Sequence, residues 1–327
     1  MKKITVLLLA LFMLVGALAG CGKQNDTNQT DKLSIVTTIF PEYDWVREIL
    51  GDKADNAEIT MLLDNGVDLH SYQPTADDIV KISDCDLFIY VGGESDEWVE
   101  DALRNAANRN MKVINLLEVL GDSVKTEEIV EGMQEEHEHE DVEEHEHEEE
   151  ADEHVWLSLK NAKMLVRVIS KALQELDPDN KDIYAANADA YVKKLSALDA
   201  EYQAAVDAAS NKTILFGDRF PFRYLVDDYG LRYYAAFVGC STETEAGFET
   251  ISFLAKRVDE LKLPCVLTIE GARHKIAETI VRNTTAKNQR VLTMDSMQST
   301  TSKDVKNGTT YLSVMEKNLS VLKEALR

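Results

Sequence analysis

The stretch "NKDIYAANADAYVKKLSALDAEYQAAVDAA" (residues 180–209) separates two similar halves of the chain and contains no glycine or proline. Its apolar residues recur at helical spacing, and alanine, the strongest helix former, is frequent. A helical hairpin inside one domain is the alternative, but no turn residue interrupts the stretch. We therefore predict one long helix, about 45 Å in length at roughly 1.5 Å per residue.

Strand-like and helix-like segments alternate on both sides of this helix. The predicted strands are residues 33–38, 57–62, 86–91 and 112–116 before it, and 213–217, 232–237, 265–269 and 290–294 after it. Helical patterns between them include residues 41–50, 75–82, 95–107, 221–230, 248–261, 274–283 and 310–326. Such alternation is typical of parallel sheets covered by helices.

We therefore expect an α/β fold with two lobes, each a four-stranded parallel sheet of βα units. The predicted N-terminal lobe is residues 33–178, the linking helix is 179–210, and the C-terminal lobe is 211–327. Open α/β sheets bind ligands at the carboxyl ends of their strands. A ligand site is accordingly expected in the cleft between the lobes.

The N-terminus has the pattern of an export signal. Lys2 and Lys3 precede the apolar run "ITVLLLALFMLVG", which is shorter than the roughly 20 residues of a membrane span. The run leads into "LAGC", which resembles the bacterial lipoprotein cleavage box. We predict a signal peptide over residues 1–20, lipidation of Cys21, and a polar tether over residues 21–32. The alternative is an ordinary secretory signal with an incidental cysteine.

The formal net charge of −24 is concentrated in one segment. Residues 126–153 hold sixteen Asp and Glu residues and no Lys or Arg, and without them the chain would carry −8. The 44% apolar content and the five prolines indicate a globular protein. Because no basic stripe is present to neutralise phosphates, nucleic acid is not an expected partner.

Three cysteines remain after Cys21. Cys85, Cys240 and Cys265 do not have the spacing of a zinc knuckle. They are either buried small residues or include one disulfide, for which Cys240 with Cys265 is the pair to test.

Four titratable residues fall where the predicted lobes would face one cleft. His70 lies in the loop after the strand 57–62, and His154 precedes "VWLSLKNAKMLVRVI". Asp218 and Asp295 each directly follow a strand. One such residue alone is more often a cap or turn residue. Two imidazoles and two carboxylates together can coordinate a divalent first-row metal.

From about residue 33 onward, the chain resembles the metal-binding lipoproteins of ABC importers, the zinc/manganese cluster of solute-binding proteins. The matching stretches are "TTIFPEYDWVREILGDKA", "LLDNGVDLHSYQPTADDIVKI", "DEHVWLSLKNAKML", "YGL" at 229–231 and "VLTMDSM". The histidines before "YQPTADD" and "VWLS" are specific motifs. The resemblance implies that His70 and His154 are metal ligands, and that Asp295 is the acidic ligand after the last strand.

The third ligand position departs from this family. Zinc-binding members usually carry His, and manganese-binding members Glu, eleven residues before the glycine of the "YGL"-type motif. Here that residue is Arg219, which stays cationic and cannot coordinate a metal. We predict Asp218 as the third ligand, with Glu270 as the backup, and we expect His274 at the surface or beside the ligands. A site of two His and two carboxylates suits manganese as readily as zinc, although affinity order favours zinc.

Four further histidines lie in the Glu-rich segment ahead of His154. Zinc-binding members of the family often carry a His- and acid-rich loop at this point. The segment 126–153 cannot bury a core, and we expect it to be disordered without metal. We interpret it as an auxiliary, low-affinity metal loop, against the alternative of a solvated acidic insertion. Its histidines are His137, His139, His145 and His147.

The resemblance implies a binding protein rather than an enzyme. We expect a monomer, anchored by lipid outside the cytoplasmic membrane. It would capture Zn²⁺, or Mn²⁺ as the alternative, and deliver the ion to an ABC permease and its ATPase. One rival is a zinc hydrolase with Glu270 as the base, although no "HExxH"-like signature is present. Another is a metal-storage or adhesive surface lipoprotein.

Overall fold

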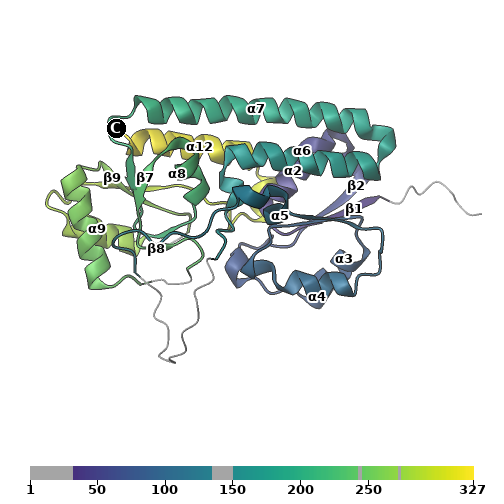
Figure 1. Cartoon of the computed structure of the whole chain (residues 1–327), viewed down its shortest axis with the longest axis horizontal. Coiled ribbons are helices and arrows are strands. Elements are labelled where there is room, and N and C mark those ends of the chain that lie inside the picture. The colour runs from purple at the N-terminus through teal and green to yellow at the C-terminus, as the bar shows by residue number, and fades with distance from the viewer. Residues whose placement is uncertain (1–31, 135–149, 242–244, 272–273) are drawn as a thin grey trace, which may run out of the picture. The chain divides into compact units, whose positions relative to one another are not determined.

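A four-stranded parallel sheet organises the first half of the chain (Figure 1). The computed structural model describes residues 32–134, 150–241, 245–271 and 274–327. In spatial order the strands are β2 (Ala57–Met61), β1 (Leu33–Thr37), β3 (Leu87–Tyr90) and β4 (Lys112–Asn115). β1 and β3 are buried at their centres because they lie inside the sheet and helices cover it.

Most helices of the first half begin where local side chains accept from free backbone amides. Glu42 accepts from the Thr38 amide at 2.8 Å ahead of α2, and Thr75 caps α3 by accepting from the Asp78 amide. Ser158 likewise caps α6. The helices are α2 (Phe40–Leu50), α3 (Ala76–Asp84), α4 (Trp98–Arg104), α5 (Leu116–Leu120) and α6 (Leu159–Leu176).

A single helix, α7 (Lys181–Ala208), connects the two halves. It contacts α6, α2 and the last helix, α12 (Tyr311–Ala325), and Figure 1 shows it running alongside α6 and α12. The Tyr202 hydroxyl donates to the Met315 carbonyl of α12 at 2.7 Å. The buried stripe of α7 is Tyr184, Ala188, Tyr191, Val192, Leu195, Leu198, Tyr202 and Val206. The prediction of one uninterrupted helix is confirmed.

The second half is also built from parallel strand pairs. β7 (Arg232–Tyr234) pairs with β5 (Thr213–Leu215), and β10 (Arg290–Thr293) pairs with β9 (Cys265–Thr268). A single parallel bridge between Phe216 and Leu267 joins these two pairs, in place of the continuous four-stranded sheet that the sequence predicted. β6 (Arg219–Phe220) and β8 (Phe237–Val238) form a further short pair that the sequence did not predict. The helices are α8 (Arg223–Tyr229), α9 (Phe248–Leu261), α10 (Lys275–Asn283) and α11 (Ser302–Lys306).

Buried polar contacts join the halves within the compact unit Leu33–Arg327. The Trp156 indole donates to the Ser296 carbonyl at 2.8 Å, and the Tyr311 hydroxyl donates to the Trp156 carbonyl at 2.7 Å. The Tyr311 amide donates to Asp44 at 2.9 Å. These side chains belong to a hydrophobic core shared by both halves. Among the described helices, none has the length and apolar character needed to cross a membrane.

Candidate metal centre

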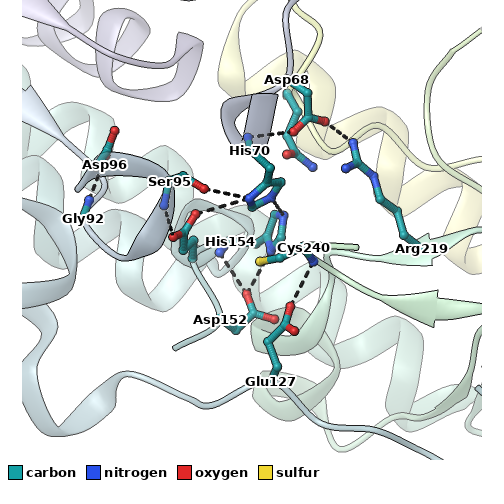
Figure 2. Close-up of polar contacts among 12 residues, drawn as sticks. Asp68, His70, Gly92, Ser95, Asp96, Glu127, Asp152, His154, Arg219 and Cys240 are labelled. Carbon is teal, nitrogen blue, oxygen red and sulfur yellow. Dashed lines mark hydrogen bonds and ion pairs between the residues drawn. The ribbon is translucent and has the colours of Figure 1, made fainter. Parts of the chain in front are cut away.

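Two histidines and one cysteine from three separate segments converge at the ends of parallel strands. His70 lies in a 3-10 turn (Leu69–Ser71) after β2, His154 directly precedes the turn Val155–Leu157, and Cys240 follows β8. The three donor atoms all lie within 4.8 Å of one another. Figure 2 shows the side chains turned toward one another. We refer to these residues as the imidazole–thiol group.

Two of the donors in this group are imidazole nitrogens that lie close together. His70 Nε2 lies 3.2 Å from His154 Nε2, and the ring centroids are 5.1 Å apart. On a tetrahedral zinc, two nitrogens with bonds of about 2.0–2.1 Å are about 3.3–3.4 Å apart. The two nitrogens are therefore already at the separation that one shared cation would impose.

A buried carboxylate holds the His154 ring in place. Asp152 Oδ1 accepts from His154 Nδ1 at 3.0 Å and from the His154 amide at 2.9 Å. The Tyr224 hydroxyl in turn donates to the Asp152 carbonyl at 2.7 Å. His154 is fully buried and its ring lies against that of Trp156. With the Nδ1 proton directed at Asp152, the lone pair of Nε2 is left for a metal.

His70 is held in the same way by a different set of groups. Its Nδ1 lies 2.8 Å from Ser95 Oγ and 3.4 Å from Glu153 Oε2. Its amide donates to Asp68 Oδ1 at 3.0 Å, which fixes the turn. Burial, and next the neighbouring His154, lower the pKa of His70 to about 3. The imidazole is therefore neutral, as a metal ligand must be, at any pH near 7.

Cys240 is positioned through its backbone and through the glycine before it. The Cys240 amide donates to Glu127 Oε1 at 2.9 Å. A Cβ at Gly239 would meet His154 Cε1 and the Phe220 carbonyl, both at 3.0 Å. Burial, followed by the charge of Glu127, raises the pKa of the Cys240 thiol. A larger residue at position 239 would require the His154 ring or the Phe220 carbonyl to shift by a few tenths of an ångström.

The flanks of the acidic segment supply these supporting carboxylates. Thr126 and Ala151 form an antiparallel bridge, and the Asp152 amide donates to the Lys125 carbonyl at 2.8 Å. Asp152 and Glu153 are both buried, and Glu153 Oε1 accepts from the Ser95 amide at 2.9 Å. This differs from the expectation that all of 126–153 is disordered. His137, His139, His145 and His147 lie outside the described residues.

The structure does not bring Asp218 into the imidazole–thiol group. Its Oδ2 accepts from the Thr268 hydroxyl at 2.6 Å and from the Ile269 amide at 3.4 Å, and its Oδ1 accepts from the Arg219 amide. The carboxylate thus ties the end of β5 to the end of β9. His274 belongs to the same neighbourhood, with Nδ1 3.0 Å from Thr268 Oγ1.

Asp295 and Glu270 also lie outside the imidazole–thiol group; we refer to them as the carboxylate pair. Glu270 accepts from the Ser296 amide and hydroxyl at 2.6 and 2.7 Å and from the Gln298 amide at 3.1 Å. Asp295 Oδ1 accepts from the Met297 amide at 2.8 Å. Burial, and next the charge of Glu270, raise the pKa of Asp295 to about 6. Both carboxylates therefore organise the turn that follows β10.

Arg219 forms an ion pair with Asp68, the residue that fixes the His70 turn (Figure 2). The pKa of Asp68 is lowered overall. Burial, the largest single cause, raises this pKa, but the charge and hydrogen bond of the Arg219 guanidinium and the contacts with His70 together outweigh it. Arg219, at the expected ligand position, thus contacts the residue that supports His70 and supplies no lone pair to a metal.

Cys240 is the residue of the group that sequence reasoning missed. Of the two alternatives left open for the cysteines, the disulfide between Cys240 and Cys265 is not formed, since Cys85, Cys240 and Cys265 are all free thiols. The alternative, buried cysteines, holds for Cys85 and Cys265. The available signal was position, because Cys240 follows a predicted strand just as Asp218 and Asp295 do.

The fold and this group define an α/β protein in which two imidazoles and a thiol from three separate segments meet at one point. Residues 35–325 match the family described as "ZnuA: Zinc-uptake complex component A periplasmic". The chain belongs to this family.

Named relatives agree with this membership. The chain is 33% identical over 324 residues to the zinc-binding lipoprotein AdcA of Streptococcus pneumoniae, covering 99% of this chain and 61% of AdcA. It is 31% identical over 321 residues to the high-affinity zinc uptake system protein ZnuA of Bacillus subtilis, covering 97% and 95%. The chain thus spans under two thirds of the length of AdcA. The Zn(II)-bound ZnuA-like domain of that AdcA matches with a TM-score of 0.70 and 30% identity, covering 90% of this chain and 99% of the domain.

Proposed function

We propose that this protein captures Zn²⁺ outside the cytoplasmic membrane and delivers it to an ABC permease driven by a cytoplasmic ATPase. The observation that carries the proposal is the 3.2 Å separation of His70 Nε2 and His154 Nε2. Each ring is fixed from its Nδ1 side by a hydrogen-bonding partner, so both free nitrogens face one point.

The donor chemistry supports zinc over manganese. Imidazole nitrogen suits zinc, whereas manganese prefers carboxylate, carbonyl and water oxygens. In the structure, the carboxylates of Asp218 and Asp295 accept hydrogen bonds from backbone amides and lie outside the group of converging donors. We therefore centre the proposal on His70 and His154. The relatives named as zinc-binding lipoprotein and zinc uptake protein support the same ion.

A binding function is proposed in preference to hydrolysis. Glu270, the imagined base of a zinc hydrolase, accepts hydrogen bonds from Ser296 and Gln298 and lies outside the imidazole–thiol group. A general base has to reach the metal-bound water directly or through one water. The carboxylates near the imidazoles, Asp152 and Glu153, instead orient the two rings.

We also propose how the protein is anchored at the membrane and how zinc is gathered near the site. Lipidation at Cys21 would hold the protein at the outer face of the membrane, beside the permease, with residues 22–32 as the tether. The histidines at 137, 139, 145 and 147 would collect zinc at low affinity next to the site. Because buried side chains such as Trp156 and Tyr311 join the halves, we expect modest movement on zinc release.

Competitive titration of the purified protein against a fluorescent zinc chelator tests this function. We expect one tight site in the wild type, at least a thousandfold preference for Zn²⁺ over Mn²⁺, and loss of the tight site in the double variant His70→Ala/His154→Ala. Glu175→Gln, an exposed carboxylate bonded to Lys112, serves as the matched control. A double variant that binds zinc as tightly as the wild type would refute the proposal.

A further inference from the structure

We propose that Cys240 is the third zinc ligand, so that the capture site of this chain is a centre of two imidazoles and one thiolate. The inference rests on the proposed function, because it assigns a ligand within the same site. It departs from the sequence-based expectation, in which the third and fourth ligands are carboxylates.

The positions of the donors carry the inference. Cys240 is the residue that joins His70 and His154 in the convergent group of the described chain, with all donors within 4.8 Å. Zinc–sulfur and zinc–nitrogen bonds of about 2.3 and 2.0–2.1 Å place the two donors about 3.6 Å apart at the tetrahedral angle. A movement of roughly 1 Å by the sulfur therefore completes three-fold coordination.

The strand register explains how a cysteine reaches this place. β6 and β8 pair in parallel, with Arg219 opposite Phe237 and Phe220 opposite Val238. Cys240 lies two residues beyond Val238, past the carboxyl end of β8. Since Arg219 is turned toward Asp68, the neighbouring strand supplies the donor that β6 does not.

The residues next to Cys240 allow its backbone to lie close to the His154 ring. Gly239 leaves room for the His154 ring, where a Cβ would stand 3.0 Å from Cε1. Glu127 holds the Cys240 amide at 2.9 Å, and the Glu127 amide itself donates to the Glu150 carbonyl at 2.9 Å. The backbone of Cys240 is thus held by a described flank of the acidic segment.

Coordination would exchange one bond for another without a redox step. The S–H bond breaks, its proton goes to solvent, and a sulfur–zinc bond forms. A thiolate is a soft donor, so it favours zinc, and also cadmium and cobalt, over manganese. Three protein ligands leave one position on the ion for water or for a donor from a partner.

Cobalt spectroscopy on the full chain tests the assignment. We expect Co²⁺ to give a near-ultraviolet thiolate charge-transfer band in the wild type that zinc abolishes. Cys240→Ser should lack the band and bind zinc about a hundredfold more weakly, since a structural zinc site distributes roughly 12 kcal/mol over its three or four ligands. Cys265→Ser, which removes a buried free thiol elsewhere, should keep both the band and the affinity.

A second measurement does not depend on the folding of any variant. In the wild type, iodoacetamide labelling of Cys240, mapped by peptide mass, should be slowed at least tenfold by stoichiometric zinc. Unchanged labelling, or a Cys240→Ser variant that keeps the band and the zinc affinity, would overturn the assignment while leaving zinc capture intact. A wild type that binds no zinc would overturn both.

Discussion

The imidazole–thiol group and the carboxylate pair both lie at the ends of parallel strands, yet their side chains are used in opposite ways. In the imidazole–thiol group, the Nδ1 atoms of the two histidines are hydrogen-bonded to Asp152 and Ser95, and the metal-binding atoms face one another. In the second, the carboxylates of Glu270 and Asp295 face the amides of their own turn. A strand-end position is therefore insufficient to identify a metal ligand. We therefore base the proposed ligand assignment on the direction of each lone pair, toward other metal donors or toward backbone amides.

The largest expected difference between the two regions is in zinc affinity. His154→Ala should weaken zinc binding at least about a hundredfold, because a ligand accounts for roughly 3 kcal/mol of a zinc site. Asp295→Asn should change it less than about threefold, because its carboxylate bonds the Met297 amide, which asparagine can also do. Competitive chelator titration gives both values, with circular dichroism to check folding. Equal losses in the two variants would place Asp295 among the ligands.

The next largest effect on zinc affinity is expected for Asp152, the carboxylate that is hydrogen-bonded to His154. Asp152→Asn should weaken zinc binding about ten- to hundredfold, as expected for the carboxylate partner of a metal-bound histidine. Asp152 Oδ1 accepts from both the ring and the amide of His154; the asparagine oxygen can still accept from them, so the expected loss comes from removing the negative charge beside the imidazole. Asp228→Asn is the matched control, since Asp228 is a partly buried carboxylate that accepts from Ser158 at 2.6 Å away from the group. If both variants weakened binding alike, a general loss of stability would be the cause.

Much of the fold was predictable because its signals are local. Pro41 and Thr75 stand at helix starts, and the predicted strands 33–38 and 86–91 contain β1 and β3. The pair β6 and β8 was not predictable, because each strand has only two residues and depends on its partner for stability.

The candidate site was predictable for the histidines and not for their neighbours. His70 and His154 stand in specific motifs, whereas the part played by Cys240 depends on the register of β8 against β6. Asp152 and Glu153 look like the end of a solvated acidic run. Their burial follows from the bridge between Thr126 and Ala151, a contact across 25 residues of chain that composition does not reveal.

A smaller effect should separate the His70 turn from the ligands themselves. Asp68→Ala removes the side chain that accepts from the His70 amide, and loss of such a cap costs about 1 kcal/mol. Zinc binding should weaken by up to about fivefold. Asp68→Asn keeps an oxygen acceptor and should lose less, although it breaks the ion pair with Arg219. Chelator titration of both variants distinguishes the cap from the charge, and a greater loss in Asp68→Asn would contradict the capping role.

The smallest effect is expected in the carboxylate pair and concerns the stability of the zinc-free protein. Burial and the charge of Glu270 raise the pKa of Asp295 from 3.8 to about 6. The folded state therefore binds this proton more tightly than the unfolded state, so the stabilisation is complete below pH 4 and is lost as the pH rises through 6. Asp295→Asn, which cannot ionise, should avoid this loss.

Thermal unfolding at pH 5 and pH 8 measures this difference. The Tm of Asp295→Asn minus the Tm of the wild type should be a few degrees larger at pH 8 than at pH 5. This estimate uses about 2–4 °C per kcal/mol for large domains. An exposed aspartate, as in Asp122→Asn, should show no such gain. Groups that do not interact with Asp295 titrate equally in the variant and the wild type, so their contributions cancel in the comparison. A gain of the same size in Asp122→Asn, or no gain in Asp295→Asn, would contradict this prediction. The folded protein would then not bind the Asp295 proton more tightly than the unfolded protein, and the carboxylate would face water more than its backbone contacts indicate.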